Sequence, residues 1–116
     1  MEESILKTIR KMIGPSVSYD VFDTDLITHI NTAFFNLYQL GVGPTKPFKI
    51  TGEEETWDDF MEGATDLEAV ISYVYMKVRL IFDPPTTGYL VTSYENMIKE
   101  LEWRLNVAVD PGPWPQ

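Results

Sequence analysis

The sequence has no cysteine among its 116 residues and only one histidine, His29. The lack of cysteine excludes disulfides, thiolate catalysis and the zinc or iron–sulfur sites that cysteine builds. A single imidazole is too little for a histidine-rich metal centre or a catalytic dyad. Asp25 precedes His29 by four residues, so the two can pair across one helical turn. We therefore interpret His29 as a structural or surface residue, and the sequence predicts no metal and no cofactor.

Long apolar runs are also lacking. No stretch approaches the roughly 20 apolar residues that a membrane-spanning helix needs, and Met1 to Ser4 do not resemble the start of a signal peptide. We therefore expect a soluble protein that is made and used in the cytoplasm and has no membrane partner. With 44% hydrophobic and 23% charged residues, a chain of this length can build one domain around one core.

Basic residues are few. Nine lysines and arginines face eighteen acidic residues, which gives a net charge of −9. Such a surface repels nucleic-acid phosphate, so tight DNA binding is disfavoured, although DNA could pass nearby without adhering. Residues 53–68 hold eight acids and no base: Glu53, Glu54, Glu55, Asp58, Asp59, Glu62, Asp66 and Glu68. Lys7, Arg10 and Lys11 instead cluster near the start. This polarity suits docking to partners or to other copies, and a solvated acidic loop is the alternative.

Apolar residues recur at spacings of three and four along most of the chain, which predicts an all-α fold. We expect a small bundle of about four helices with a long central loop over 42–63 and an extended C-terminal tail. The predicted helices cover residues 3–13, 25–40 and 88–106, and a further helix starts at the capping box Thr65 to Glu68 and is stopped by Asp83-Pro84-Pro85. This helix is apolar on nearly all sides, so it should lie at the centre of the bundle.

Local signals mark the ends of these segments. Asp23 or Thr24 can cap the second helix, and Thr56 can cap a single helical turn over 56–61. Thr65 to Glu68 read as a capping box, and Phe48 to Thr51 as a short extended piece. Three prolines predict that residues 107–116 are not helical. The sequence thus predicts a helical domain over 1–106 and a proline-rich tail over 107–116.

No motif indicates catalysis. The acids Asp20, Asp23 and Asp25 lack the glycine and the terminal glutamate of a calcium loop. Carboxylate pairs such as Asp58 and Glu62 would need a cleft that separates their pKa values, and the surrounding charge indicates exposure instead. No glycine-rich phosphate loop occurs, and no base stands ready to activate a serine or threonine. We expect a protein that is not an enzyme.

The C-terminal part contains candidate binding residues. Trp103 lies at the edge of the apolar stripe of the last helix, and Trp114 lies between two prolines. Tryptophan is typical of interface anchors, and proline lowers the entropy lost when an extended peptide binds. The predicted partner-binding residues are Trp103, Val107, Val109, Pro111 and Trp114, with a disordered end as the alternative for the tail.

Four segments resemble the head–tail connector proteins, also called head-completion or neck adaptor proteins, of long-tailed bacteriophages. These segments are FDTDLITHIN (22–31), TWDDF (56–60), TDLEAVISYVYMKVRLIFDPPT (65–86) and ELEWRLNV (100–107). The similarity covers roughly residues 2–107. Its most specific part is the helix that ends in Phe82-Asp83-Pro84-Pro85.

This resemblance implies a structural virion protein without a cofactor. Such proteins form a ring, commonly of twelve copies, below the portal, where the ring extends the DNA channel and joins the head to the neck or tail. The implied partners are other copies, the portal protein and the next neck or tail protein, with DNA only as transiting cargo. The implied location is the neck of the virion, after assembly in the host cytoplasm. In this chain the bridging segments would be the 42–63 loop and the 107–116 tail.

A ring is a head-to-tail assembly in which one patch meets a different patch on the neighbour. We therefore predict ring-contact or lumen residues in the two charged regions: Lys7, Arg10, Lys11, Glu53, Glu54, Glu55, Asp58 and Asp59. Lys77, Arg79 and Arg104 are alternative basic partners. Two other functions stay open, namely an acidic DNA mimic and a small helical regulator that binds a partner helix.

Overall fold

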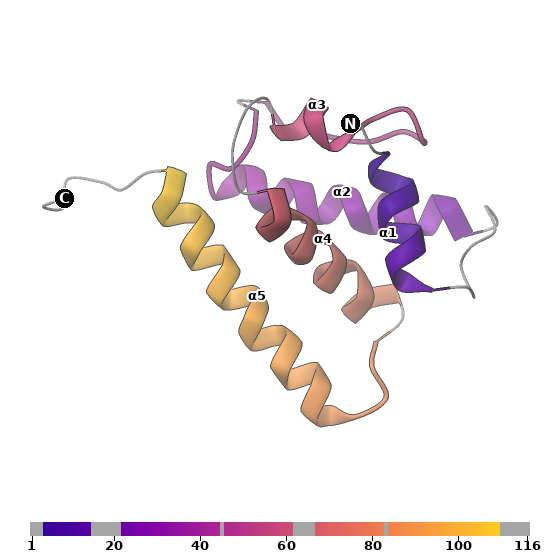
Figure 1. Ribbon diagram of the computed structural model, residues 1–116, viewed down its shortest axis with the longest axis vertical. Helices are drawn as coiled ribbons and strands as arrows, with labels where there is room; N and C mark the ends of the chain where they lie inside the picture. Colours follow the sequence, from indigo (N-terminus) through magenta and orange to yellow (C-terminus); the bar gives the residue numbers. More distant parts are fainter. Residues whose placement is uncertain (1–3, 15–21, 45, 62–66, 83, 110–116) are drawn as a thin grey trace, which may run out of the picture.

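The computed structural model describes residues 4–14, 22–44, 46–61, 67–82 and 84–109 (Figure 1). These residues form five α-helices and no strand, which confirms the all-α prediction. The helices are α1 (Ile5–Ile13), α2 (Asp23–Gln39), α3 (Trp57–Met61), α4 (Leu67–Phe82) and α5 (Gly88–Val109).

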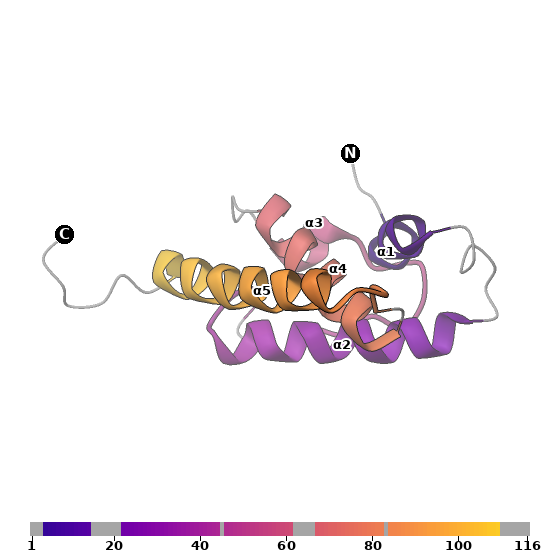
Figure 2. The same ribbon diagram turned by 90° about the horizontal axis from the view of Figure 1, so that it is seen from below.

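Helix α4 is central, as its apolar pattern predicts. It packs against α1, α2 and α5, and Val70, Tyr73, Val74 and Val78 along it are fully buried. Seen from below, α2 forms one outer layer while α1 and α3 lie on the opposite side (Figure 2). Helix α5 runs along the edge of this assembly and packs on α4. The outer sides of α2 and α5 are therefore separate surfaces of the molecule.

The core gathers aromatic rings around Phe34 of α2. Its ring centroid lies 5.1 Å from that of Phe48, 6.2 Å from that of Trp57 and 4.7 Å from that of Phe60. These partners come from the central loop and from α3, so the loop contributes to the core rather than lying on it. Burial of each large ring contributes roughly 1.5–3 kcal/mol to folding, which holds the segment in place.

The central loop is tied to α2 by Asn31. Its side-chain Oδ1 accepts from the Ile50 backbone N–H at 2.7 Å, and its Nδ2 donates to the Ile50 carbonyl at 3.0 Å. Phe48 to Thr51 belong to no strand, and Ile50 among them is buried. The only bridge in the described residues is the single pair Ser4 and Thr56.

Two predicted caps differ in outcome. Thr56 caps α3 as predicted: its Oγ1 accepts from the Asp59 N–H at 3.2 Å, while Asp59 Oδ2 accepts from the Thr56 N–H at 2.9 Å. The prediction for α2 is wrong, because Phe22 occupies the cap position and makes no side-chain cap bond. Asp23 begins α2 itself, and its carboxylate is bound by Arg10. Helix α1 begins at Ile5, two residues later than predicted, because Ser4 Oγ accepts from the Lys7 N–H at 3.2 Å.

Helix α5 extends to Val109, three residues past the predicted end at residue 106. Residues 107–109 contain no proline, and the first proline after them is Pro111. The prediction assigned the whole of 107–116 to an extended tail because of its prolines, but a proline stops a helix only at and just before its own position. The predicted capping box at Thr65 lies outside the described residues, as do residues 110–116.

Candidate interaction surfaces

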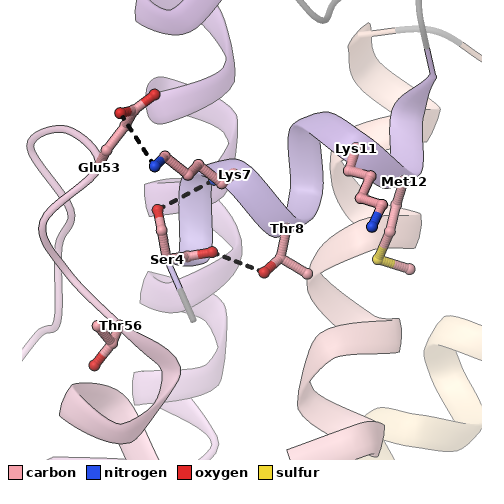
Figure 3. A pocket seen from close by; sticks show the side chains of 7 residues that line it. All are labelled: Ser4, Lys7, Thr8, Lys11, Met12, Glu53 and Thr56. Carbon is pink, nitrogen blue, oxygen red and sulfur yellow. Dashed lines mark hydrogen bonds and ion pairs between the residues drawn. The ribbon is translucent and has the colours of Figure 1, made fainter. Parts of the chain in front are cut away.

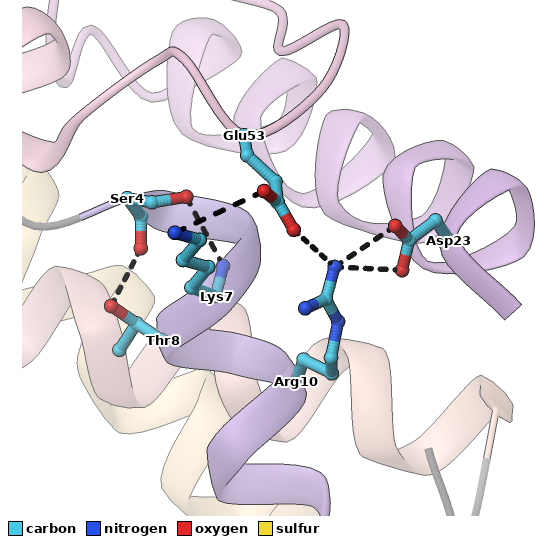
Figure 4. Close-up of polar contacts among 6 residues, drawn as sticks. All are labelled: Ser4, Lys7, Thr8, Arg10, Asp23 and Glu53. Carbon is cyan, nitrogen blue, oxygen red and sulfur yellow. Dashed lines mark hydrogen bonds and ion pairs between the residues drawn. The ribbon is translucent and has the colours of Figure 1, made fainter. Parts of the chain in front are cut away.

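A cluster of ion pairs joins α1, α2 and the acidic part of the loop (Figure 4). Arg10 Nη2 donates to both carboxylate oxygens of Asp23, at 3.0 and 2.9 Å, and to Glu53 Oε2 at 2.8 Å. Lys7 Nζ lies 3.9 Å from Glu53 Oε1. Lys7, Arg10 and Glu53 are predicted ring-contact residues, and the structure brings these opposite charges together within one chain.

Burial sets the strength of this cluster. The Arg10 side chain is only 14% exposed, whereas that of Lys7 is 63% exposed. The hydrogen bond from Arg10 is the main cause that lowers the pKa of Glu53, and the nearby charge of Lys7 lowers it further. Arg10 therefore acts as an internal tie, while Lys7 remains largely in contact with solvent.

Beside this cluster lies an open groove of about 590 Å³ (Figure 3). Its lining comes from the N-cap and body of α1 and from the first part of the acidic segment: Ser4, Lys7, Thr8, Lys11, Met12, Glu53 and Thr56. The start of α1 is fixed to the loop here, because the Ile5 N–H donates to the Glu55 carbonyl at 3.1 Å. Trp57 Nε1 also donates to Thr8 Oγ1 at 3.1 Å. Lys11 is exposed at this groove, so it is the predicted basic residue most available to a partner.

The predicted acids divide into two groups. Glu53, Glu55 and Asp59 have roles inside the chain: Glu55 accepts from Thr51 Oγ1 at 2.8 Å, and Asp59 caps α3. Burial opposes ionisation of Glu55, but the hydrogen bonds from Thr51 and Gly52 lower its pKa overall. Glu54 and Asp58 are exposed. Glu53 and Asp59 are exposed too, but their carboxylates are engaged within the chain, so Glu54 and Asp58 are the acids more available to a partner or a channel.

Helix α5 presents apolar side chains to solvent. Trp103 is 67% exposed, and Tyr89, Leu90, Met97 and Val107 are exposed as well. Trp103 and Val107 therefore lie on the surface, as a partner-binding role requires. Val109 is the last residue of the helix, and the predicted binding residues Pro111 and Trp114 lie outside the described residues.

The seam between α4 and α5 contains a buried polar contact that sequence reasoning missed. Tyr73 Oη donates to Glu102 Oε2 at 2.7 Å. Burial, followed by this hydrogen bond, raises the pKa of Tyr73 far above its ordinary value, so the phenol keeps its proton. The contact joins α4 to α5. Its two residues are 29 positions apart, and no local pattern indicates the pairing.

The outer side of α2 was also passed over by sequence reasoning. We define the α2 outer face as Thr28, Thr32, Phe35, Tyr38 and Gln39, all of which are exposed. The rings of Phe35 and Tyr38 lie 6.1 Å apart. A signal was present in the sequence, because residues 26–40 contain no aspartate, glutamate, lysine or arginine. Interface cores are depleted in charge and enriched in aromatic residues, which is the composition of this face.

The described residues contain no group of three side chains able to hold a metal ion. Within that same part of the chain, no helix is long and apolar enough to cross a membrane. The features that stand out are surfaces: an ion-paired edge, an exposed apolar side of α5 and an uncharged side of α2.

Comparison with known proteins gives one match. The family model described as "Phage connector protein" matches residues 5–112, a range that includes all five helices. No curated protein and no solved structure matches the chain. The family match covers nearly the whole sequence and agrees with a helical molecule whose notable features are contact surfaces. The chain belongs to the phage connector protein family.

Proposed function

We propose that the chain forms a ring of about twelve copies below the portal, extends the DNA channel and joins the head to the next neck or tail protein. Membership of the connector family supports a structural head–tail connector role and a place in the virion. The observation that carries the attachment to a partner is the exposed Trp103 at the C-terminal end of α5.

Trp103 and Val107 supply an apolar anchor, and residues 110–116 follow directly at the end of α5. A large exposed tryptophan is costly to leave in water and is a frequent hot spot when a partner covers it. We assign this C-terminal end of α5, together with the tail, to the portal protein. The proline-rich composition of the tail favours the same assignment, because a stiff segment loses less entropy on docking.

The acidic segment is suited to lining a channel through which DNA passes. Glu54 and Asp58 are exposed, and the chain carries a net charge of −9. A ring with such residues toward its lumen repels phosphate and lets DNA slide without specific binding. The rival function, an acidic DNA mimic, has less support. It needs its carboxylates displayed in a row, whereas Glu53, Glu55 and Asp59 are engaged inside the chain.

The portal contact can be measured with Trp103→Ala and the portal protein of the same phage. Loss of a hot-spot tryptophan should weaken binding about tenfold or more, while the helical circular dichroism spectrum stays unchanged. Ile81→Ala is the matched control, because Ile81 is an exposed apolar residue of α4. Equal affinities of wild type and Trp103→Ala would refute the assigned contact. Purified virions that lack the chain would refute the connector function itself.

A further inference from the structure

Removing the α2 outer face from water costs little desolvation free energy. Thr28 Oγ1 donates to the Thr24 carbonyl and Thr32 Oγ1 to the Thr28 carbonyl, both at 3.0 Å. These hydroxyl protons are already used inside the helix, so the threonines offer their methyl groups to the surface. Phe35 adds a ring that is 47% exposed. The face therefore combines apolar area with few groups that need a new hydrogen-bond partner.

A second apolar surface lies on α5. Leu90 and Met97 are both partly exposed, and they lie seven residues, about two turns, apart on one side of α5. Asn106 of α5 reaches toward α2, because its Nδ2 donates to the Leu40 carbonyl at 2.9 Å. Met97 precedes Asn106 by nine residues, about two and a half turns, so it lies on the opposite side of α5. The row formed by Leu90 and Met97 therefore faces away from α2.

Charge favours a second copy of the chain as the occupant of the α2 outer face. A basic partner would be drawn to the exposed acids Glu54 and Asp58 rather than to an uncharged helix side. Another copy of the chain carries the same net charge of −9 and is repelled wherever acids face acids. Two copies can approach closely where their contact surfaces lack charge, and the α2 outer face meets that condition along its whole length.

We propose that the α2 outer face of one copy packs against the Leu90–Met97 row of the next copy. Because the two surfaces are different, this contact is head-to-tail and repeats from copy to copy. The proposal rests on the proposed connector function and names the surfaces by which the copies associate. It moves the subunit contact away from the basic edge of α1, where Arg10 is already bound within its own chain.

Cysteine cross-linking tests this contact, because the natural chain has no cysteine. Virions would be assembled from the double variant Thr32→Cys/Met97→Cys and oxidised mildly. The head-to-tail contact predicts a ladder of disulfide-linked copies on a denaturing gel. Thr32→Cys alone and Met97→Cys alone should give no linked dimer. The control is Thr32→Cys/Lys99→Cys, which moves the second cysteine about 200° around α5 and should give no ladder.

Each outcome decides a separate claim. Virions that contain the chain but show no ladder overturn the proposed contact and leave the connector function standing. A dimer from Thr32→Cys alone also overturns it, because α2 would then meet α2. Virions without the chain overturn the connector function, and this contact with it. In a second measurement, Phe35→Glu should weaken self-association about tenfold or more, while the fold, checked by circular dichroism, is retained.

Discussion

At the scale of single residues, Arg10 holds three parts of the chain together. Its guanidinium binds Asp23 at the start of α2 and Glu53 in the acidic segment, and its own stem belongs to α1. Without this side chain Asp23 would lose its ion pair, and Glu53 would keep only the longer pair with Lys7. The ion pairs of Arg10 help to hold the acidic segment against the bundle, despite the repulsion among its carboxylates.

The Glu53 carboxylate should make stability depend on pH. Its pKa in the folded chain is lowered from the ordinary value of 4.5, mainly by the hydrogen bond from Arg10. Its contribution is therefore complete above about pH 4.5 and is lost as the pH falls through the lower folded-state value. In Glu53→Gln the free energy of unfolding, measured with urea from neutral to acid pH, should fall less steeply. Glu54→Gln, at the exposed neighbour, should retain the wild-type slope, and equal slopes for wild type and Glu53→Gln would contradict the role of the ion pair.

At the scale of elements, the turn after α2 depends on a glycine. Gly43 has φ of +95°, and a Cβ placed there would lie 2.5 Å from Cε1 of Phe60 in the core. Gly14 at the end of α1 also has positive φ, but a Cβ there meets open space. A substitution at Gly14 therefore measures the cost of backbone strain alone, whereas one at Gly43 adds the cost of a steric clash with Phe60.

We predict that Gly14→Ala lowers the free energy of unfolding by about 1 kcal/mol, the cost of the backbone conformation alone. Gly43→Ala should lower it by about 2–4 kcal/mol, because the Phe60 ring must also move. Urea unfolding of both variants checks the difference. Equal losses would show that the core accommodates the extra methyl group without strain.

The elements also show what sequence reasoning can reach. Periodicity located four helices within a few residues, and Thr56 marked the start of α3, because both signals act over one or two turns. The Asp23 carboxylate is bound by Arg10, 13 residues away, and the loop is held by Asn31, 19 residues from Ile50. Such partners are chosen by tertiary packing, so no local pattern predicts them. The absence of charged residues from 26–40 is visible in the sequence. Which side of this helix is exposed, however, is known only from the packing of the helices.

At the scale of the whole molecule, salt distinguishes the two ways in which copies could associate. A contact between the basic edge of α1 and an acidic segment weakens as salt screens it. The residues of the α2 outer face and of the Leu90–Met97 row carry no charge, while the −9 chains that carry them repel each other. Raising sodium chloride from about 0.05 to about 0.5 M should therefore strengthen self-association. Sedimentation of the purified chain measures this, and weaker association at high salt would favour the charged contact instead.

Asn31 gives the assembly a further property. It lies seven residues, about two turns, before Tyr38, so it stands on the same flank of α2 as part of the outer face. The Asn31 side chain makes two hydrogen bonds with the backbone of Ile50, and Glu53 and Glu54 follow Ile50 by three and four residues. The loop that carries these carboxylates is thus held by the same helix that contacts the neighbouring copy. Each copy would therefore present its carboxylates at the same height along the axis of the ring. Repeated around a closed ring, this spacing would produce a level collar of negative charge rather than a scattered one.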